Sequence, residues 1–295
     1  MKKLKSMSTA KLYKVFIYLA LITLAITIIV PVLWVFMASI KENPEFYGNP
    51  WALPKGIHLQ NFAEAWNKAK MGEYFLTSII VTLMALVMLL VTAIPLAYVV
   101  SRFEFKLKKA IKTLMMAGLF VNVNYIVIPI FLMLLQGDRF LIKARLVVSP
   151  IFLNNHFMLA LIYAATAIPF TVYLLMSYFE TIPRAYEEAA MIDGATNFKT
   201  MVKVMVPMAR PSIVTVILFN FMAFWNEYII SLTLLPNATS TLPVGLIRLM
   251  QAQRSAANYG PMYAGLVIVM LPTLIVYILL QKRLTEGMTV GGVKG

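Results

Sequence analysis

The sequence predicts an all-α polytopic membrane protein with six transmembrane helices, both termini in the cytoplasm, and a cytoplasmic loop of two short helices. Three observations support this prediction: 61% of residues are hydrophobic and only 13% charged, long apolar runs recur, and basic residues cluster between the runs. Soluble domains have about 25% charged residues, and a soluble fold of 295 residues could not bury this much apolar surface. Most of the chain is therefore expected to lie in lipid.

Six apolar runs are long enough to be helical spans. Five of them contain windows without any Asp, Glu, Lys or Arg, each longer than the ~20 residues that cross a hydrocarbon core as a helix; Glu227 alone interrupts the sixth. Polar and apolar residues do not alternate in them, which favours helices over barrel strands. The predicted spans are residues 15–40, 74–101, 113–136, 157–178, 211–235 and 262–281. Together they predict a single transmembrane domain over residues 1–295.

Lysine and arginine set the predicted orientation, because cytoplasmic loops of membrane proteins carry an excess of basic residues. Most of the 26 basic residues fall on the side that holds both termini, the second loop and the fourth loop. This side is therefore predicted to be cytoplasmic, which agrees with an even number of spans. The N-terminal lysines and the apolar run after them predict a retained first helix, because the run is too long for a signal peptide.

Several classes of chemistry are excluded by composition. The chain has no cysteine and only two histidines, His58 and His156, so a metal site is not expected. No GxxxxGK[ST] phosphate loop, HExxH motif or Gly-rich dinucleotide fingerprint occurs. The net charge of +14 is divided into short clusters between apolar runs, unlike the patch of a nucleic-acid-binding protein. We expect no active site, cofactor or metal in this chain.

Polar residues within or beside the predicted spans are candidates for a translocation path. Glu227 is the one ionisable residue inside a span, where a buried charge is costly. The other candidates are Asn122, Asn124, Tyr125, Asn220 and Asn226. Two interpretations remain open: these residues line a path for a polar solute, or they hold helices together through interhelical hydrogen bonds.

Residues 180–210, between the fourth and fifth spans, are the most polar long stretch in the second half of the chain. Ala185 to Ile192 is rich in helix formers, and Gly194 supplies a stop. Thr196 or Asn197 can cap a second helix, and an apolar stripe at helical spacing follows: Phe198, Met201, Val202 and Met205. The stripe either docks into a groove on a partner protein or packs against the ends of this protein's own helices.

EEAAMIDGA at residues 187–195, followed by Pro207, resembles the EAA loop of permease subunits of binding-protein-dependent ABC importers. PVLWVFMASIK, FNFMAFWNEY, TLPVGL and GMTVGGVKG are similar to the sugar-importer branch of that family, which is the MalG-like, maltose-type branch. The resemblance covers nearly the whole chain. One segment departs from it: GDRFLIKARLVVSPIFLNNH is longer and more basic than the family pattern, so its outer contacts are not implied.

The resemblance implies that the 180–210 loop is a coupling helix seated in a cleft of a separate ATPase subunit. The implied coupling residues are Glu187, Glu188, Ala189, Ala190, Asp193, Gly194 and Pro207. Glu188 would contact a basic residue of the ATPase, the alanines would allow close approach, and Gly194 would set the elbow. The implied ATPase-contacting tail is Gly291, Gly292, Val293, Lys294 and Gly295.

The resemblance also implies a non-catalytic subunit of an ATP-driven importer in the cytoplasmic membrane of a bacterium or archaeon. Its expected partners are a second homologous permease, two ATP-binding subunits that hold ATP and Mg, an extracytoplasmic binding protein that delivers a sugar, in particular an oligosaccharide, and membrane lipid. No nucleic acid is expected. Two alternatives remain: a permease of an amino-acid or peptide ABC importer, and an ion-coupled secondary transporter.

Overall fold

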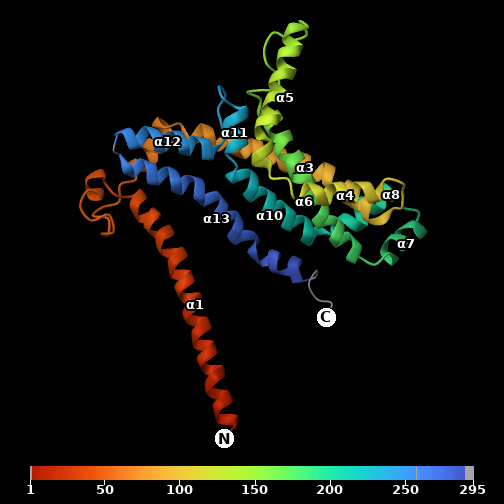
Figure 1. The fold of residues 1–295 in the computed structure, drawn as a ribbon, viewed down its shortest axis with the longest axis horizontal. Coiled ribbons are helices and arrows are strands. Elements are labelled where there is room, and N and C mark those ends of the chain that lie inside the picture. The colour runs from red at the N-terminus through yellow and green to blue at the C-terminus, as the bar shows by residue number, and fades with distance from the viewer. Residues whose placement is uncertain (1, 257, 290–295) are drawn as a thin grey trace. The chain divides into compact units, whose positions relative to one another are not determined.

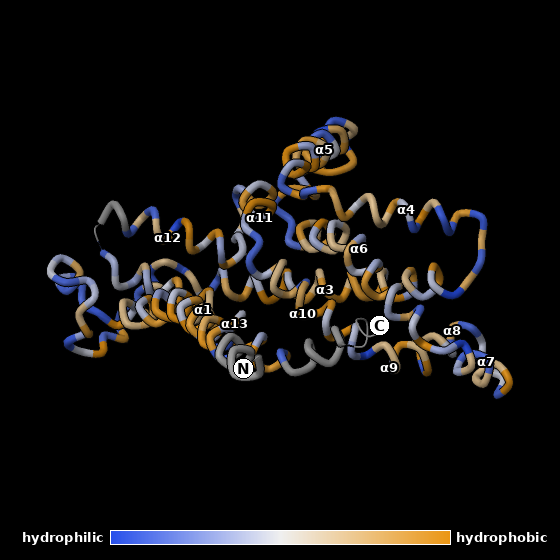
Figure 2. Tube along the Cα trace, turned by 60° about the horizontal axis from the view of Figure 1, so that its bottom comes forward, coloured by the Kyte–Doolittle hydropathy of each residue, from blue (hydrophilic) through white to orange (hydrophobic). Residues whose placement is uncertain are grey.

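The computed structural model describes residues 2–256 and 258–289, with side chains placed for residues 11–253 and 258–281. Every regular element in the described ranges is a helix (Figure 1). Five helices are long and apolar enough to cross a membrane, or six if a helix pair bent by 75° forms one span. Hydrophobic residues follow the long helices, and hydrophilic residues gather at connections such as the one between α3 and α4 (Figure 2).

The chain divides into two compact units, where the sequence predicts one domain. One unit contains the residues up to Lys70 together with Arg248–Ile268, and the other contains Met71–Ile247 and the residues from Val269 onward. The helices α12 (Leu242–Ala256) and α13 (Tyr259–Thr289) therefore each contribute to both units.

The first unit is built on α1 (Lys2–Ser39), whose span-forming part, Lys11–Ser39, has no buried residue in its most apolar window. An apolar surface of this extent is stable only against lipid or another protein, because exposure to water would be strongly unfavourable. The most apolar part of the first helix is therefore expected to face lipid or another protein.

Three short helices follow α1: η1 (Asn43–Phe46), α2 (Gln60–Ala63) and η2 (Glu64–Lys68). The Asn61 amide donates to the carbonyl oxygens of Ser39 and Lys41 at 3.0 and 2.9 Å, which returns the segment to the end of α1. The buried Lys41 ammonium donates to the carbonyl of Pro50 at 2.7 Å. The segment after α1 thus forms a compact turn made of short helices.

A carboxylate fixes the first of these short helices. Glu45 accepts hydrogen bonds from the backbone N–H groups of Glu42 and Lys55, both at 2.9 Å. These two backbone bonds favour the ionised form and lower the pKa of Glu45. The capping interaction therefore holds throughout the neutral pH range.

The second unit is centred on α3 (Met71–Arg102) and α6 (His156–Thr181), which pack against each other along much of their length. One face of α3 buries every fourth residue, at Ala85, Leu89, Ala93 and Ala97. Small residues in this register allow the two helix backbones to approach closely. The helices α4 (Lys108–Gly118) and α10 (Arg210–Asn226) complete this core.

The third predicted span, residues 113–136, is wrong in its boundaries. The membrane-length helix is α5 (Val123–Lys143), and a break at residues 119–122 separates it from α4. Asn122 is the N-cap of α5, and its side chain accepts a hydrogen bond from the Asn124 N–H at 3.0 Å. The break is not visible in the sequence because Leu119, Phe120 and Val121 continue the apolar run.

The fifth predicted span, residues 211–235, is not a continuous helix. The helix α10 ends at Asn226, Glu227 is extended, and a short α11 (Ile229–Leu234) follows and packs against α5. Glu227 side-chain bonds, described below, stabilise this interruption. Apolar residues on both sides of Glu227 conceal it in the sequence.

Residues 180–210 fold into two helices that meet at an elbow. The first is α7 (Ala185–Ile192), and the second is made of α8 (Asn197–Thr200), the π-helical η3 (Met201–Met205) and α9 (Val206–Met208). The second helix joins α10 at the 75° bend. Pro207 and Pro211 lie on either side of this bend, where the helical hydrogen-bond pattern is interrupted.

A buried carboxylate organises the segment between α5 and α6. Asp138 is 2% exposed, and its oxygens accept the backbone N–H groups of Ile151, Phe152 and Leu153 at 2.8, 2.9 and 3.0 Å. A carboxylate surrounded by backbone donors is stable without a cation. Asp138 of α5 therefore holds the end of the segment that precedes α6 in place.

Replacement of Asp138 by Ala should destabilise the protein by about 3 kcal/mol, because three backbone N–H groups, one buried and two partly buried, lose their charged acceptor. The midpoint of thermal unfolding in detergent should fall, and trypsin should cleave after Lys143 and Arg145 faster than in the wild type. Glu104→Ala, which removes an exposed carboxylate paired only with Lys108, should change neither measurement. An unchanged midpoint in Asp138→Ala would contradict this role.

Candidate functional site

Local sequence signals build the elbow between α7 and α8. Gly194 has φ +79°, a left-handed conformation that side chains with a Cβ rarely adopt, and it ends α7. Thr196 then caps α8, because its hydroxyl oxygen accepts the Lys199 N–H at 3.3 Å. These two residues fix the angle at which the second helix leaves the first.

The acidic pair at the start of EEAA is divided between the inside and the outside of the protein. Glu187 is buried, whereas Glu188 is exposed. One Glu187 oxygen accepts the Tyr98 hydroxyl at 2.8 Å, and the other lies 3.2 Å from Nε of Arg102. Adjacent residues of a helix point about 100° apart, so one can face α3 while the other faces outward.

Arg102, the last residue of α3, also binds the start of the loop. Its Nη2 donates to the carbonyl oxygen of Ile182 at 2.6 Å, and Ile182 is the C-cap of α6. The sequence reasoning did not identify Tyr98 or Arg102. In the sequence, Arg102 is one of several basic residues that follow a predicted span, and nothing in the pattern pairs it with Glu187.

The outward face of the elbow combines acidic and large apolar side chains. Ile192 is 87% exposed and Phe198 is 72% exposed, and both lie close in sequence to the exposed Glu188 and Asp193. Exposed apolar residues rimmed by charge mark protein interaction surfaces. Of the implied coupling residues, Ala189 and Gly194 are also exposed, and Ala190 is half-buried.

The apolar stripe of the second helix is divided between a buried and an exposed edge. Met201 and Met205 are buried in the core of the unit, whereas Phe198 and Val202 are exposed. The buried edge therefore packs against this protein, as one of the two interpretations of the stripe predicts. Pro207 is exposed in α9.

A cleft of about 160 Å³ opens between α7 and the end of α3. Its lining combines cations, carboxylates and apolar groups: Tyr98, Arg102, Phe103, Arg184, Glu187, Glu188 and Met191. The cleft lies at the junction of the buried and exposed acidic residues. The predicted tail, Gly291 to Gly295, lies outside the described residues.

The candidate path residues do not form one cluster of hydrogen bonds in the described part of the chain. Asn122 and Asn124 begin α5, and Tyr125 beside them is 82% exposed. Asn220 is buried, and its amide donates to the Thr171 hydroxyl at 3.0 Å, which joins α10 to α6. For Asn220, the interhelical interpretation is therefore the one that the structure supports.

Glu227 is used to start a helix. Its oxygens accept the backbone N–H groups of Ile230 and Ser231 at 2.8 and 3.2 Å, and the Tyr163 hydroxyl donates to it at 2.7 Å. Because these donors occupy both carboxylate oxygens, Glu227 joins α10, α11 and α6. Asn226 beside it is exposed, and its amide donates to the carbonyl of Met222 at 2.8 Å.

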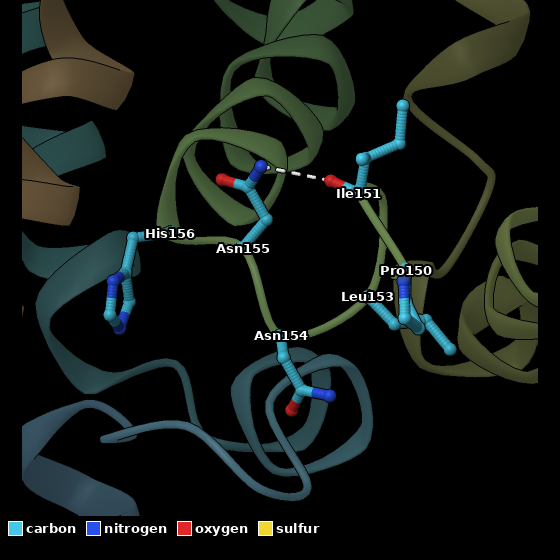
Figure 3. A pocket seen from close by; sticks show the side chains of 6 residues that line it. All are labelled: Pro150, Ile151, Leu153, Asn154, Asn155 and His156. Carbon is cyan, nitrogen blue, oxygen red and sulfur yellow. Dashed lines mark hydrogen bonds between the residues drawn. The ribbon is translucent and has the colours of Figure 1, made fainter. Parts of the chain in front are cut away.

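A polar cavity of about 470 Å³ lies at the start of α6 and is lined by residues 150, 151 and 153–156 (Figure 3). Its polar side chains are engaged in structural bonds. Asn154 accepts the N–H groups of Asn237 and Ala238, Asn155 donates to Ile151, and His156 lies 2.7 Å from the carbonyl of Thr239. These bonds connect the segment before α6 with the segment after α11.

This chain resembles known proteins over most of its length. Residues 93–289 match the family described as binding-protein-dependent transport system inner membrane component. The diacetylchitobiose uptake system permease protein NgcG of Streptomyces coelicolor is 35% identical over 277 residues, covering 92% of this chain and 86% of that protein. The trehalose/maltose transport system permease protein MalG of Thermococcus litoralis is 29% identical over 289 residues, covering 96% and 98%.

A solved structure shares the fold. One chain in the crystal structure of a bacterial ABC transporter involved in the import of the acidic polysaccharide alginate matches with a TM-score of 0.76 at 23% identity. The match covers 93% of this chain and 97% of the other. The family match over residues 93–289 and the 35% identity to NgcG show that the chain is a member of the family of inner membrane components of binding-protein-dependent transport systems.

Proposed function

We propose that this chain is the non-catalytic permease subunit of an ATP-driven importer of oligosaccharides. It pairs with a second homologous permease to form the translocation path, and two ATPase subunits that bind ATP and Mg drive it. An extracytoplasmic binding protein delivers the sugar. The chain lies in the cytoplasmic membrane of a bacterium or archaeon with both termini and the 180–210 loop in the cytoplasm, as the distribution of basic residues favours.

The outward face of the α7–α8 elbow is the observation that carries this proposal. A short helix that presents Glu188 beside exposed apolar residues, on an elbow fixed by Gly194, suits a groove with a basic residue in a partner. ATP-driven closure of the ATPase dimer would displace this elbow. The chain has no phosphate loop, so the energy for transport has to enter through such a contact.

A sugar substrate is supported by the relatives. The names of the Streptomyces and Thermococcus proteins described above refer to uptake of diacetylchitobiose and of trehalose and maltose. Both proteins align over more than four-fifths of their length with this chain. We therefore place the substrate among small oligosaccharides.

The path itself is proposed to form between this chain and the second permease. The exposed Asn124, Tyr125 and Asn226 remain candidates for it, because no core packing covers their side chains. Asn220 and Glu227 contribute by holding the helices in place. The tail residues 291–295 are proposed to reach the ATPase subunits.

Replacement of Glu188 by Lys should abolish ATP-driven uptake while the protein remains in the membrane. The lysine would repel the basic residue of the ATPase that the Glu188 carboxylate is proposed to contact. Uptake into cells and the amount of tagged protein in the membrane fraction measure the two effects. Glu104→Lys, the same reversal at an exposed residue outside the elbow, should retain uptake. Normal uptake in Glu188→Lys would overturn the assignment of the elbow.

Purification of the tagged chain from its host in mild detergent should yield a complex that contains an ATPase and a second permease. Deletion of the chain should abolish uptake of a radiolabelled sugar from a panel of diacetylchitobiose, trehalose and maltose. Uptake that persists without ATP and follows an ion gradient would instead indicate a secondary transporter. A complex that takes up amino acids or peptides and no sugar would indicate the other importer class.

A further inference from the structure

We infer that Glu187 is a positioning residue for coupling: its bonds to Arg102 and Tyr98 make α7 move as one body with the end of α3. This inference rests on the proposed function, because it concerns how a displacement of α7 by an ATPase reaches the spans. The ATPase would displace α7 through its contact with Glu188, and Glu187 would transmit this displacement of α7 to α3. The two neighbouring glutamates have separate tasks.

Burial makes the Glu187–Arg102 contact a strong constraint. The two side chains are 10% and 7% exposed, so water does not screen the charges. Removing either partner would leave the other charge buried and unpaired, which is strongly unfavourable. The nearby pair of Lys112 and Glu180, at 2.9 Å, is 38% and 45% exposed and contributes little by comparison.

Arg102 connects three elements at one point. It ends α3, contacts Glu187 of α7, and donates to the carbonyl of Ile182 at the end of α6. The Arg102 Nε lies within ion-pair distance of Glu187, but its N–H direction does not meet hydrogen-bond geometry, so this contact is electrostatic. An ion pair without a fixed N–H direction can tolerate small rotations of α7 while it still resists separation.

Tyr98 holds the other carboxylate oxygen in a fixed position. Its ring packs edge-on against Phe103 and Phe179, with centroids 5.7 and 5.8 Å apart, and its hydroxyl donates to Glu187 at 2.8 Å. Tyr98 lies one helical turn before Arg102, so both side chains project from the same face of α3. The carboxylate is therefore held at two points on one rigid helix.

The end of α3 is a suitable place to receive a displacement. The helix is 32 residues long, packs against α6 along much of its length, and also contacts α10. A movement applied at Arg102 would therefore reach the core of the second unit through packed side chains, the kind of contiguous network that transmits coupling. A test has to show that α3 follows α7 only when Glu187 is present.

The test uses the complete complex in proteoliposomes. This chain has no cysteine, so Tyr186→Cys on α7 and Val99→Cys on α3 direct a pair of spin labels to exposed sites outside the proposed docking face. With Glu187 present, the distance between the labels should be the same without nucleotide and after trapping with ADP and vanadate. In Glu187→Gln, the distance distribution should broaden and change on trapping, and uptake per ATP hydrolysed should fall at least about tenfold.

Two further variants and one control separate positioning from general destabilisation. Arg102→Glu combined with Glu187→Arg restores an ion pair but loses the Tyr98 and Ile182 hydrogen bonds, so its distribution should be narrower than that of Glu187→Gln and broader than that of the wild type. Tyr98→Phe, which retains the ion pair, should also broaden the distribution less than Glu187→Gln. Glu180→Gln removes a carboxylate from the exposed pair and should match the wild type. If Glu187→Gln does not assemble, the exchanged pair and Tyr98→Phe provide the result.

The outcomes also separate this inference from the proposed function. A complex that hydrolyses ATP and imports sugar, but in which Glu187→Gln gives the wild-type distances, would overturn the inference alone. Failure of any ATPase to copurify with the wild-type chain would overturn the proposed function. Equal broadening in the Glu180→Gln control would also overturn the inference, because loss of the Arg102–Glu187 pair would then not be its cause.

Discussion

A buried carboxylate without partners is costly, and this constraint determines how the acidic groups of the second unit are used. Asp138, Glu187 and Glu227 each take their donors from elements that are distant in sequence or from the start of a new helix. A carboxylate that would be costly alone thereby becomes a junction between elements. The packing of α3 with α6 supplies the area of contact, and the carboxylates determine which ends meet.

Burial also shows which apolar groups stay exposed in the described residues. The most apolar window of α1 has no buried residue, and Ile192 and Phe198 at the elbow are 87% and 72% exposed. Exposed apolar surface is unfavourable in water, so we expect lipid or protein to cover these residues. In the proposed complex, the ATPase covers those of the elbow.

The sequence predicted well what depends on local signals. Long apolar runs produced helices, and Gly194 and Thr196 ended and began the elbow helices where their chemistry favours it. It failed where the deciding partner is remote or the signal is apolar. The break before Asn122 lies in an uninterrupted apolar run, and the use of Glu227 as a cap depends on Tyr163 from another helix. The burial of Glu187 likewise depends on Tyr98 and Arg102.

The division of the two adjacent glutamates has a consequence for how the chain evolves. Glu187 is bound to Arg102 of the same polypeptide, so any change at one position has to be compensated within the same gene. Glu188 faces outward, and in the proposed complex its compensating changes would arise in the gene for the ATPase. The two neighbouring glutamates would therefore covary with residues of different proteins, Glu187 with Arg102 of this chain and Glu188 with the ATPase. A host that exchanges one ATPase for another would constrain only Glu188.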